Sequence, residues 1–248
     1  MPAPMQPSTS TSSEGASALE RAKQLVEQGD LGTALAGLSA HPDPLEVAKA
    51  HAGLAAFLYN TKKDVSGMLD CGRAGIKLSL AAAEQNSKTD EAVAARLEDK
   101  AKTLAFNVAA NCWPGWDDDG IALTTEHMRT GLALAEQSLE LVRKLRLGDQ
   151  RQGTAHWLVG ALHLALGHNG LAAMEFDCAK AAFDAAHQPI ESRMVSGYRA
   201  IGDQRDGAKR DDAVREFARI VAALESENSD KARFFARQLR RAERVLKP

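Results

Sequence analysis

Aromatic residues are scarce in this sequence, at 5% of 248 residues, and runs of β-branched residues long enough for a strand are also rare. Alanine and leucine supply most of the 44% apolar share. These two residues are the strongest apolar helix formers, whereas strands are enriched in β-branched and aromatic side chains. The composition therefore predicts an all-α protein.

Cysteine is almost as rare, with only Cys71, Cys112 and Cys178 in the whole chain. No two of them form a CxxC pair, which is the spacing that zinc knuckles use. An odd number of isolated cysteines also argues against a disulfide framework. We expect free thiols, no metal site, and a reducing compartment such as the cytoplasm.

Long apolar runs are missing as well. No stretch approaches the roughly 20 apolar residues that a membrane-spanning helix needs. Residues 1–17 are rich in Pro, Ser and Thr and lack the apolar core of a secretory signal. We expect residues 1–16 to form a disordered tail, and we expect a cytoplasmic protein with no membrane partner.

Motifs of the common enzyme classes are absent too. The sequence has no phosphate-binding glycine loop, no GxSxG elbow and no HExxH pair. His156 and His163 lie seven residues apart on one helical face, but no Glu or Cys stands at ligand spacing from both. An EF-hand loop starting at Asp117 would lack its final glutamate, because Met128 stands there. We therefore expect no enzyme activity, no catalytic residues and no cofactor.

Helix signals, by contrast, recur along the whole chain. A capping box begins at Ser17, and Asp43-Pro44 places an N-cap and a helix-compatible proline at another start. The joints between the apolar-periodic segments are short and polar, so consecutive helices must lie antiparallel. After a first helix from Ser17 to the break at Gly29, the pattern predicts helices over 31–38, 44–60, 64–86, 89–111, 121–147, 152–166, 169–187, 190–202, 209–226 and 230–246.

One unit shows a repeat pattern clearly. Gly160 in one predicted helix is followed by Ala172, Phe176 and Ala179 in the next, and Gly167 ends the first helix. Gly29 stands 138 residues before Gly167, which is close to four repeats of about 34 residues. In these residues the chain resembles the tetratricopeptide-repeat (TPR) family.

That resemblance implies a fold and a general role. It implies antiparallel helical hairpins stacked as a right-handed solenoid, with residues 17–248 as a single domain and the last helix as a cap. A solenoid of the same kind outside the strict family is the alternative, because helical hairpins converge on alanine-rich contacts. In proteins similar to TPRs the first helix of each hairpin lines a concave groove that holds a peptide. The residues of this chain in that position are Asn107, Asn111, Trp157 and Leu164.

The most unusual segment is the loop 112–120. It contains Trp113, Trp116 and three consecutive aspartates from Asp117 between two long predicted helices. The indole rings and carboxylates are typical of a recognition loop. Alternatively, the tryptophans plug the mouth of a hairpin and the aspartates stabilise the N-terminus of the next helix.

The last helix is strongly basic. Residues 229–248 contain seven basic residues against two acidic ones. Four arginines follow helical spacing on one face, opposite an apolar stripe: Arg233, Arg237, Arg240 and Arg244. The face is either the solvated side of a cap or a patch for phosphate or an acidic partner. Nucleic acid is a poor fit, because no aromatic residue interrupts the basic face and the net charge of the chain is −2.

Together these patterns predict a scaffold or adaptor that binds a protein or peptide. The alternative is a small-molecule-binding sensor or an enzyme with a pocket near the loop 112–120. The sequence leaves the oligomeric state open.

Overall fold

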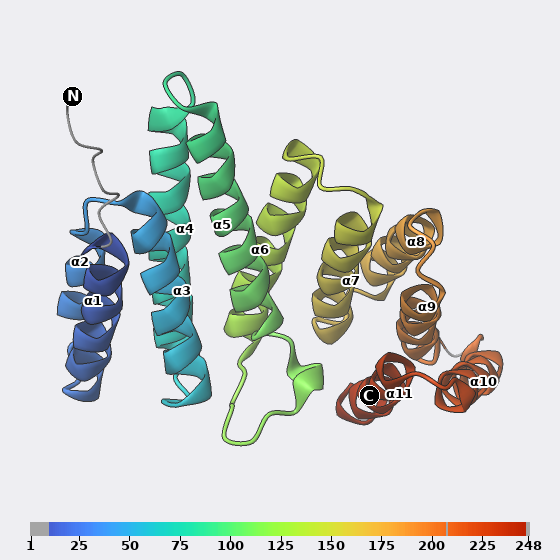
Figure 1. Cartoon of the computed structure of the whole chain (residues 1–248). Coiled ribbons are helices and arrows are strands. Elements are labelled where there is room, and N and C mark those ends of the chain that lie inside the picture. The colour runs from blue at the N-terminus through green and yellow to red at the C-terminus, as the bar shows by residue number, and fades with distance from the viewer. Residues whose placement is uncertain (1–9, 207, 247–248) are drawn as a thin grey trace. The chain divides into compact units, whose positions relative to one another are not determined.

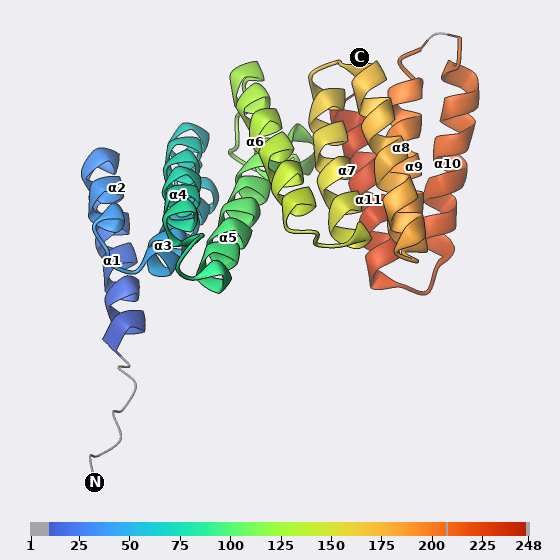
Figure 2. The same ribbon diagram turned by 90° about the horizontal axis from the view of Figure 1, so that it is seen from above.

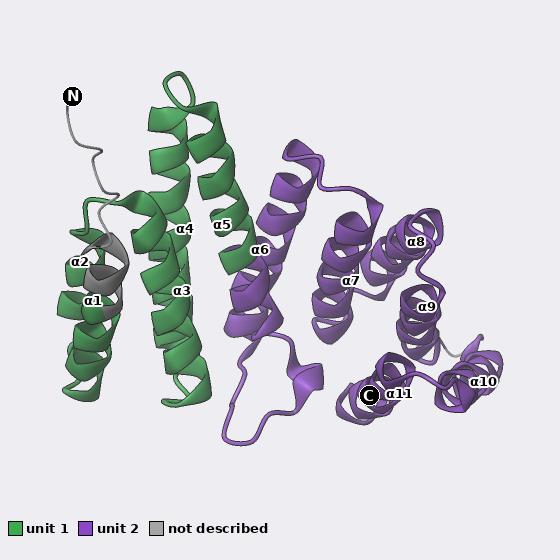
Figure 3. Ribbon diagram, in the orientation of Figure 1, with its two compact units in different colours: residues 1–104 green, residues 105–248 purple. Residues whose placement is uncertain are grey.

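In a computed structural model, which describes residues 10–206 and 208–246, every regular element is helical. The chain divides into two compact units, residues 1–104 and 105–248 (Figure 3). The boundary falls inside α5 (Glu91–Ala110). The all-α class predicted from composition is confirmed for this part of the chain, whereas a single domain over 17–248 stays a prediction.

The first unit is built from consecutive helices that pack on one another (Figure 1). It contains α1 (Ser10–Glu27), α2 (Leu31–Ser39), α3 (Pro44–Asn60), α4 (Val65–Asn86) and most of α5 (Glu91–Ala110). Helices two apart in the sequence also touch, α1 with α3 and α2 with α4. Gly75 permits the close approach of α4, since a Cβ there would lie 2.6 Å from the Cβ of His51 on α3.

The second unit follows the same plan and ends in a helix that folds back across it. It contains η1 (Pro114–Trp116), α6 (Thr125–Lys144), α7 (Asp149–Ala165), α8 (Asn169–Ala185), α9 (Pro189–Asp203), α10 (Arg210–Ser226) and α11 (Asp230–Val245). Figure 2 shows α8, α9 and α10 side by side. Helix α11 packs on α10, as a cap would, and it also packs on α9 and η1.

Local capping explains where several helices begin. The side chain of Asp43 accepts a hydrogen bond from the backbone N–H of Leu45 at 2.8 Å, and Asp64 accepts one from Gly67 at 2.8 Å. Both starts agree with the sequence prediction, because an N-cap satisfies backbone donors without tertiary help.

Two predicted helix starts differ from the structure by more than three residues. Helix α1 begins at Ser10 rather than Ser17, since no proline stands between Ser10 and Glu27 to stop the helix there. The tail predicted for residues 1–16 falls mainly on residues 1–9, which lie outside the described part, so it stays a prediction. Helix α6 begins at Thr125 rather than at residue 121, because Thr124 and His127 form a reciprocal capping box at that point.

The α7–α8 hairpin shows why the repeat pattern has its glycines. A Cβ on Gly160 would lie 2.7 Å from the ring of Phe176, and one on Gly153 would lie 2.9 Å from the ring of Phe183. The two glycines stand seven residues apart on α7, so both face α8 and both admit a phenylalanine. The Gly160 and Phe176 positions of the pattern are thus in direct contact across this hairpin.

Candidate partner-binding site

The second unit brings together the three tryptophans of the chain. The ring centroid of Trp113 lies 4.9 Å from that of Trp116 and 5.8 Å from that of Trp157, both with edge-to-face geometry. Tyr198 on α9 lies 5.6 Å from Trp113 and stacks on Phe176 at 5.8 Å. In a chain this poor in aromatic residues, the cluster brings all three tryptophans together with a tyrosine and a phenylalanine.

The loop after α5 is shaped so that Trp113 and Trp116 can meet. Pro114 opens the 3₁₀ turn η1, and Asp117 closes it in the left-handed region at a φ of 52°. Gly115 carries no Cβ, and one would lie 2.2 Å from the Trp113 ring. The indole N–H of Trp116 donates to the carbonyl of Ala110 at 2.7 Å, which fixes the ring against the end of α5.

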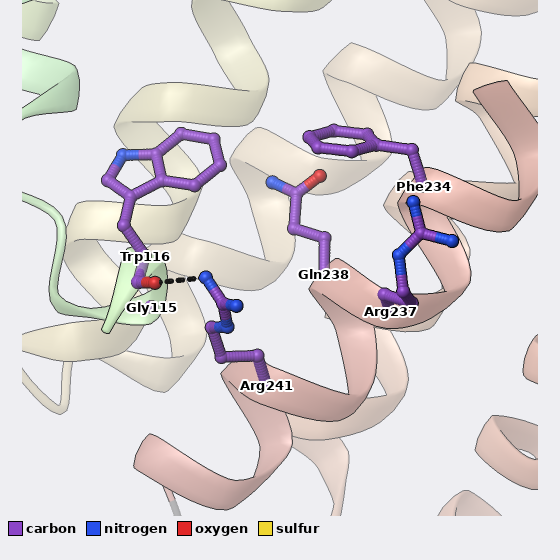
Figure 4. A pocket seen from close by; sticks show the side chains of 6 residues that line it. All are labelled: Gly115, Trp116, Phe234, Arg237, Gln238 and Arg241. Carbon is purple, nitrogen blue, oxygen red and sulfur yellow. Dashed lines mark hydrogen bonds between the residues drawn. The ribbon is translucent and has the colours of Figure 1, made fainter. Parts of the chain in front are cut away.

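Helix α11 holds this loop from the other side. Arg241 donates to the backbone carbonyl of Trp116 at 2.5 Å, as Figure 4 shows, and Arg244 pairs with Asp117 at 2.5 Å. The contact joins residues 125 positions apart in the sequence. It explains why α11 touches η1 in addition to α9 and α10.

Two adjoining pockets lie where η1 and α11 meet. The larger is about 190 Å³ and the smaller about 100 Å³, and Trp116, Phe234 and Gln238 line both. The larger pocket is walled by five aromatic side chains: Trp116, Trp157, Phe183, Phe234 and Phe235. The smaller pocket adds Arg237 and Arg241 (Figure 4). Phe234 remains 48% exposed, so an apolar surface is open to solvent at the mouth of both.

Several side-chain polar atoms at this site are buried. They are Trp157 Nε1, Tyr198 Oη, Glu191 Oε2 and Gln238 Oε1. Burial raises the pKa of Tyr198 well above its usual value, so its hydroxyl stays protonated. Gln238 is only 6% exposed and lines both pockets. The Tyr198 hydroxyl lies within hydrogen-bonding reach of the Gln238 and Trp157 side chains, so the three polar groups partly satisfy one another.

The structure gathers some of the predicted binding residues and separates others. Trp116 and Trp157 line the larger pocket, while Trp113 is completely buried beneath them. Trp113 is thus a packing residue, as the plug interpretation of the loop expected. Leu164 is also completely buried, so its side chain offers no surface to a partner, contrary to the expectation. Its side chain lies against α9, where a Cβ added at Gly202 would stand 3.5 Å from it.

Asn107 and Asn111 lie apart from the two pockets. They stand at and just after the C-terminal end of α5, where Asn107 is exposed and Asn111 is half-buried. Neither lines either pocket. Their role in binding stays a prediction.

The basic stripe of α11 is mostly neutralised by carboxylates. Arg233 pairs with Asp230 at 2.7 Å, Arg240 with Glu225 at 2.9 Å, and Arg244 with Asp117. Arg237 forms no ion pair among residues 10–206 and 208–246, and it is the stripe residue that lines a pocket. Within the stripe, Arg237 is therefore the member whose positive charge no carboxylate of the described residues neutralises.

The sequence pattern did not predict Phe234, Gln238 or Glu191 as site residues. Phe234 and Phe235 stand side by side in a sequence with seven phenylalanines, which was a usable signal. Nothing in the local pattern distinguishes Gln238 or Glu191 from solvated polar residues. Only their burial beside the aromatic cluster does so.

A second polar cluster lies between α6, α7 and α8. His156 Nδ1 lies 2.6 Å from a carboxylate oxygen of Glu175, and Arg143 approaches the other ring nitrogen at 3.3 Å. The Nδ1 atoms of His163 and His168 lie 3.3 Å apart. Across the described residues, no group of three or more His, Cys, Asp and Glu side chains is placed to hold a metal ion.

No protein-family model matches the sequence, and no curated protein matches it either. In the described part of the chain, every helix is too short or too polar to cross a membrane. The interpretation of the site consequently rests on its geometry.

Proposed function

We propose that this protein is a TPR-like scaffold that binds a segment of a partner protein, and that the two pockets between η1 and α11 hold side chains of that segment. The repeat interpretation is supported by the contacts between helices two apart, α1 with α3 and α7 with α9. Stacked hairpins make such contacts because each one rotates slightly on the last. The Gly160–Phe176 contact within one hairpin supports it as well.

The observation that carries the proposal is the exposed aromatic surface of Phe234 beside two pockets. One of these pockets contains Arg237, which has no ion pair in the described chain. Binding hot spots are enriched in tryptophan and arginine, and they centre on desolvated pockets. Trp116, Phe234 and Arg237 provide that combination here. The pockets measure about 190 and 100 Å³, whereas drug-sized ligands usually occupy about 300–1,000 Å³. Their size suits one or two side chains of a peptide better than a metabolite.

Capture from an extract of the native cell with matched variants tests the proposal. Phe234→Ala removes an exposed aromatic ring at the pocket mouth and should abolish capture of a specific partner. Met174→Ala removes an even more exposed apolar side chain, at 65%, from the outer face of α8 and should leave capture intact. Equal capture by the wild type and both variants would contradict the proposed site.

The small-molecule alternative makes a different prediction for the same loop. A metabolite that enters the larger pocket would contact Trp116 and Trp157, so it should change the tryptophan emission of the wild type. A screen of metabolites by fluorescence tests this, with Phe234→Ala as the control that removes one wall. A response that is lost in the variant would favour the sensor role.

A further inference from the structure

The two pockets differ in charge, and this difference indicates which side chains of a partner segment each pocket can hold. The smaller pocket is lined by Arg237 and Arg241 together with Gln238. Arg241 uses one nitrogen to bind the carbonyl of Trp116, and the rest of its guanidinium group lies beside the pocket (Figure 4). Since a guanidinium carries five N–H donors and Arg237 has no ion pair in the described chain, this pocket is rich in unused donors.

The larger pocket is close to neutral despite containing a carboxylate. Glu191 is bound through Oε1 to Lys231 at 2.7 Å, and only its Oε2 lacks a partner. The remaining walls are five aromatic rings, Met194, Thr154 and Gln238. An aromatic cage can bind an organic cation, but Lys231 already compensates the one acid that would favour it. An uncharged apolar or aromatic side chain is therefore the better occupant.

Gln238 lines both pockets, and in the smaller one its side chain stands between Trp116 and Phe234 (Figure 4). It is only 6% exposed and lies within hydrogen-bonding reach of the Tyr198 hydroxyl. Trp116 and Phe234 also line both pockets, so the two pockets share a wall. Neighbouring side chains of one segment can therefore enter one pocket each.

The geometry points to a partner segment in which a bulky apolar residue and an acidic residue are adjacent. The apolar side chain fills the space between Trp116, Trp157 and Phe234. The carboxylate binds Arg237, with Arg241 beside it, through charge-assisted hydrogen bonds. This inference rests on the proposed function and specifies the chemistry of the segment.

Blocked peptides titrated into the full-length protein, with tryptophan emission as the readout, test the inference. The acidic probes carry Phe-Asp or Asp-Phe at the centre of a serine hexapeptide with acetyl and amide ends. Comparison peptides replace the Asp with Asn or Lys, or the Phe with Ala. We expect the better acidic probe to bind about tenfold more tightly than its Asn counterpart, because a hydrogen bond between charged groups is stronger than a neutral one.

Two variants that remove the same charge from α11 supply the control. Arg237→Gln should make the Asp and Asn peptides bind with equal affinity. Arg233→Gln should keep the difference, because Arg233 is occupied by Asp230 and lies outside both pockets. Circular dichroism of both variants checks that the helices are unchanged.

The possible outcomes distinguish this inference from the proposed function on which it rests. Equal binding of the Asp and Asn peptides to the wild type would overturn the carboxylate site and leave the apolar pocket standing. Tighter binding of the Lys peptide would show instead that Glu191 and the aromatic rings select a cation. If no probe binds at millimolar concentration while capture from extract still depends on Phe234, the inference fails and the proposed function survives.

Discussion

Gly115 shows at the residue scale how little room the tryptophan cluster leaves. An added Cβ would lie 2.2 Å from the rigid ring of Trp113. We expect Gly115→Ala to lower the free energy of unfolding of residues 105–248 by about 1–3 kcal/mol, as overpacked cores do. Chemical denaturation followed by tryptophan emission measures this. Gly170→Ala on α8 meets nothing within 4 Å and serves as the control; equal loss in both variants would contradict the packing argument.

The three thiols should differ sharply in reactivity. Burial raises the pKa of both Cys71 and Cys112 to about 12, whereas Cys178 is exposed on α8. Since the thiolate is the reactive form, iodoacetamide should label Cys178 alone in the folded protein. Mass spectrometry before and after denaturation checks this. A Cys178→Ala variant that still labels quickly while folded would disprove it.

Burial of His51 predicts the direction in which the stability of the protein changes with pH. Desolvation lowers its pKa below the ordinary value of 6.5, so the folded protein holds it neutral. The unfolded chain therefore binds more protons in the window just below pH 6.5, and stability falls as pH falls through that window. Denaturation followed by circular dichroism at about pH 7.5 and about pH 5.5 should show the fall. His51→Gln should reduce its slope; an unchanged slope would assign the effect to other groups, among them His163, whose pKa is also lowered by burial.

At the scale of elements, the attachment of η1 to α11 combines a strong contact with a weak one. Arg244 and Asp117 are 70% and 48% exposed, and exposed ion pairs contribute about 0–1 kcal/mol. Arg241 binds the carbonyl of Trp116 itself and lines the smaller pocket. We expect Arg241→Ala to increase quenching of tryptophan emission by acrylamide, and Arg244→Ala to change it little. The reverse order would show that the ion pair, rather than the carbonyl contact, holds the loop.

At the scale of the whole molecule, we expect a destabilising substitution in one unit to leave the stability of the other unit nearly unchanged. Stability in stacked repeats is mainly a sum over neighbouring units, and all the tryptophans lie in residues 105–248. Gly75→Ala forces a Cβ to within 2.6 Å of His51 in the first unit. It should shift the unfolding transition seen by circular dichroism and leave the transition seen by tryptophan emission in place. A shared shift in both signals would show that the described chain unfolds as one cooperative body.

The sequence by itself determined the helices and several of their ends. Asp43 and Asp64 cap helices through atoms two or three residues away, and short polar joints force antiparallel neighbours, so both features are local. Gly160 and Phe176 belong to the same hairpin and were predictable for the same reason. The predicted start at Ser17 failed, because the capping-box pattern there does not begin the helix, which starts at Ser10.

Only the tertiary structure decided where a partner can bind. The pockets need η1, α7, α8, α9 and α11 in one place, and their meeting depends on packing between helices far apart in the sequence. Asp117 reaches the basic stripe from η1 and Glu225 reaches it from the neighbouring helix α10, which leaves Arg237 as its unpaired member among the described residues. Helical spacing placed four arginines on one face, but the charge that a partner meets depends on which acids fold against them.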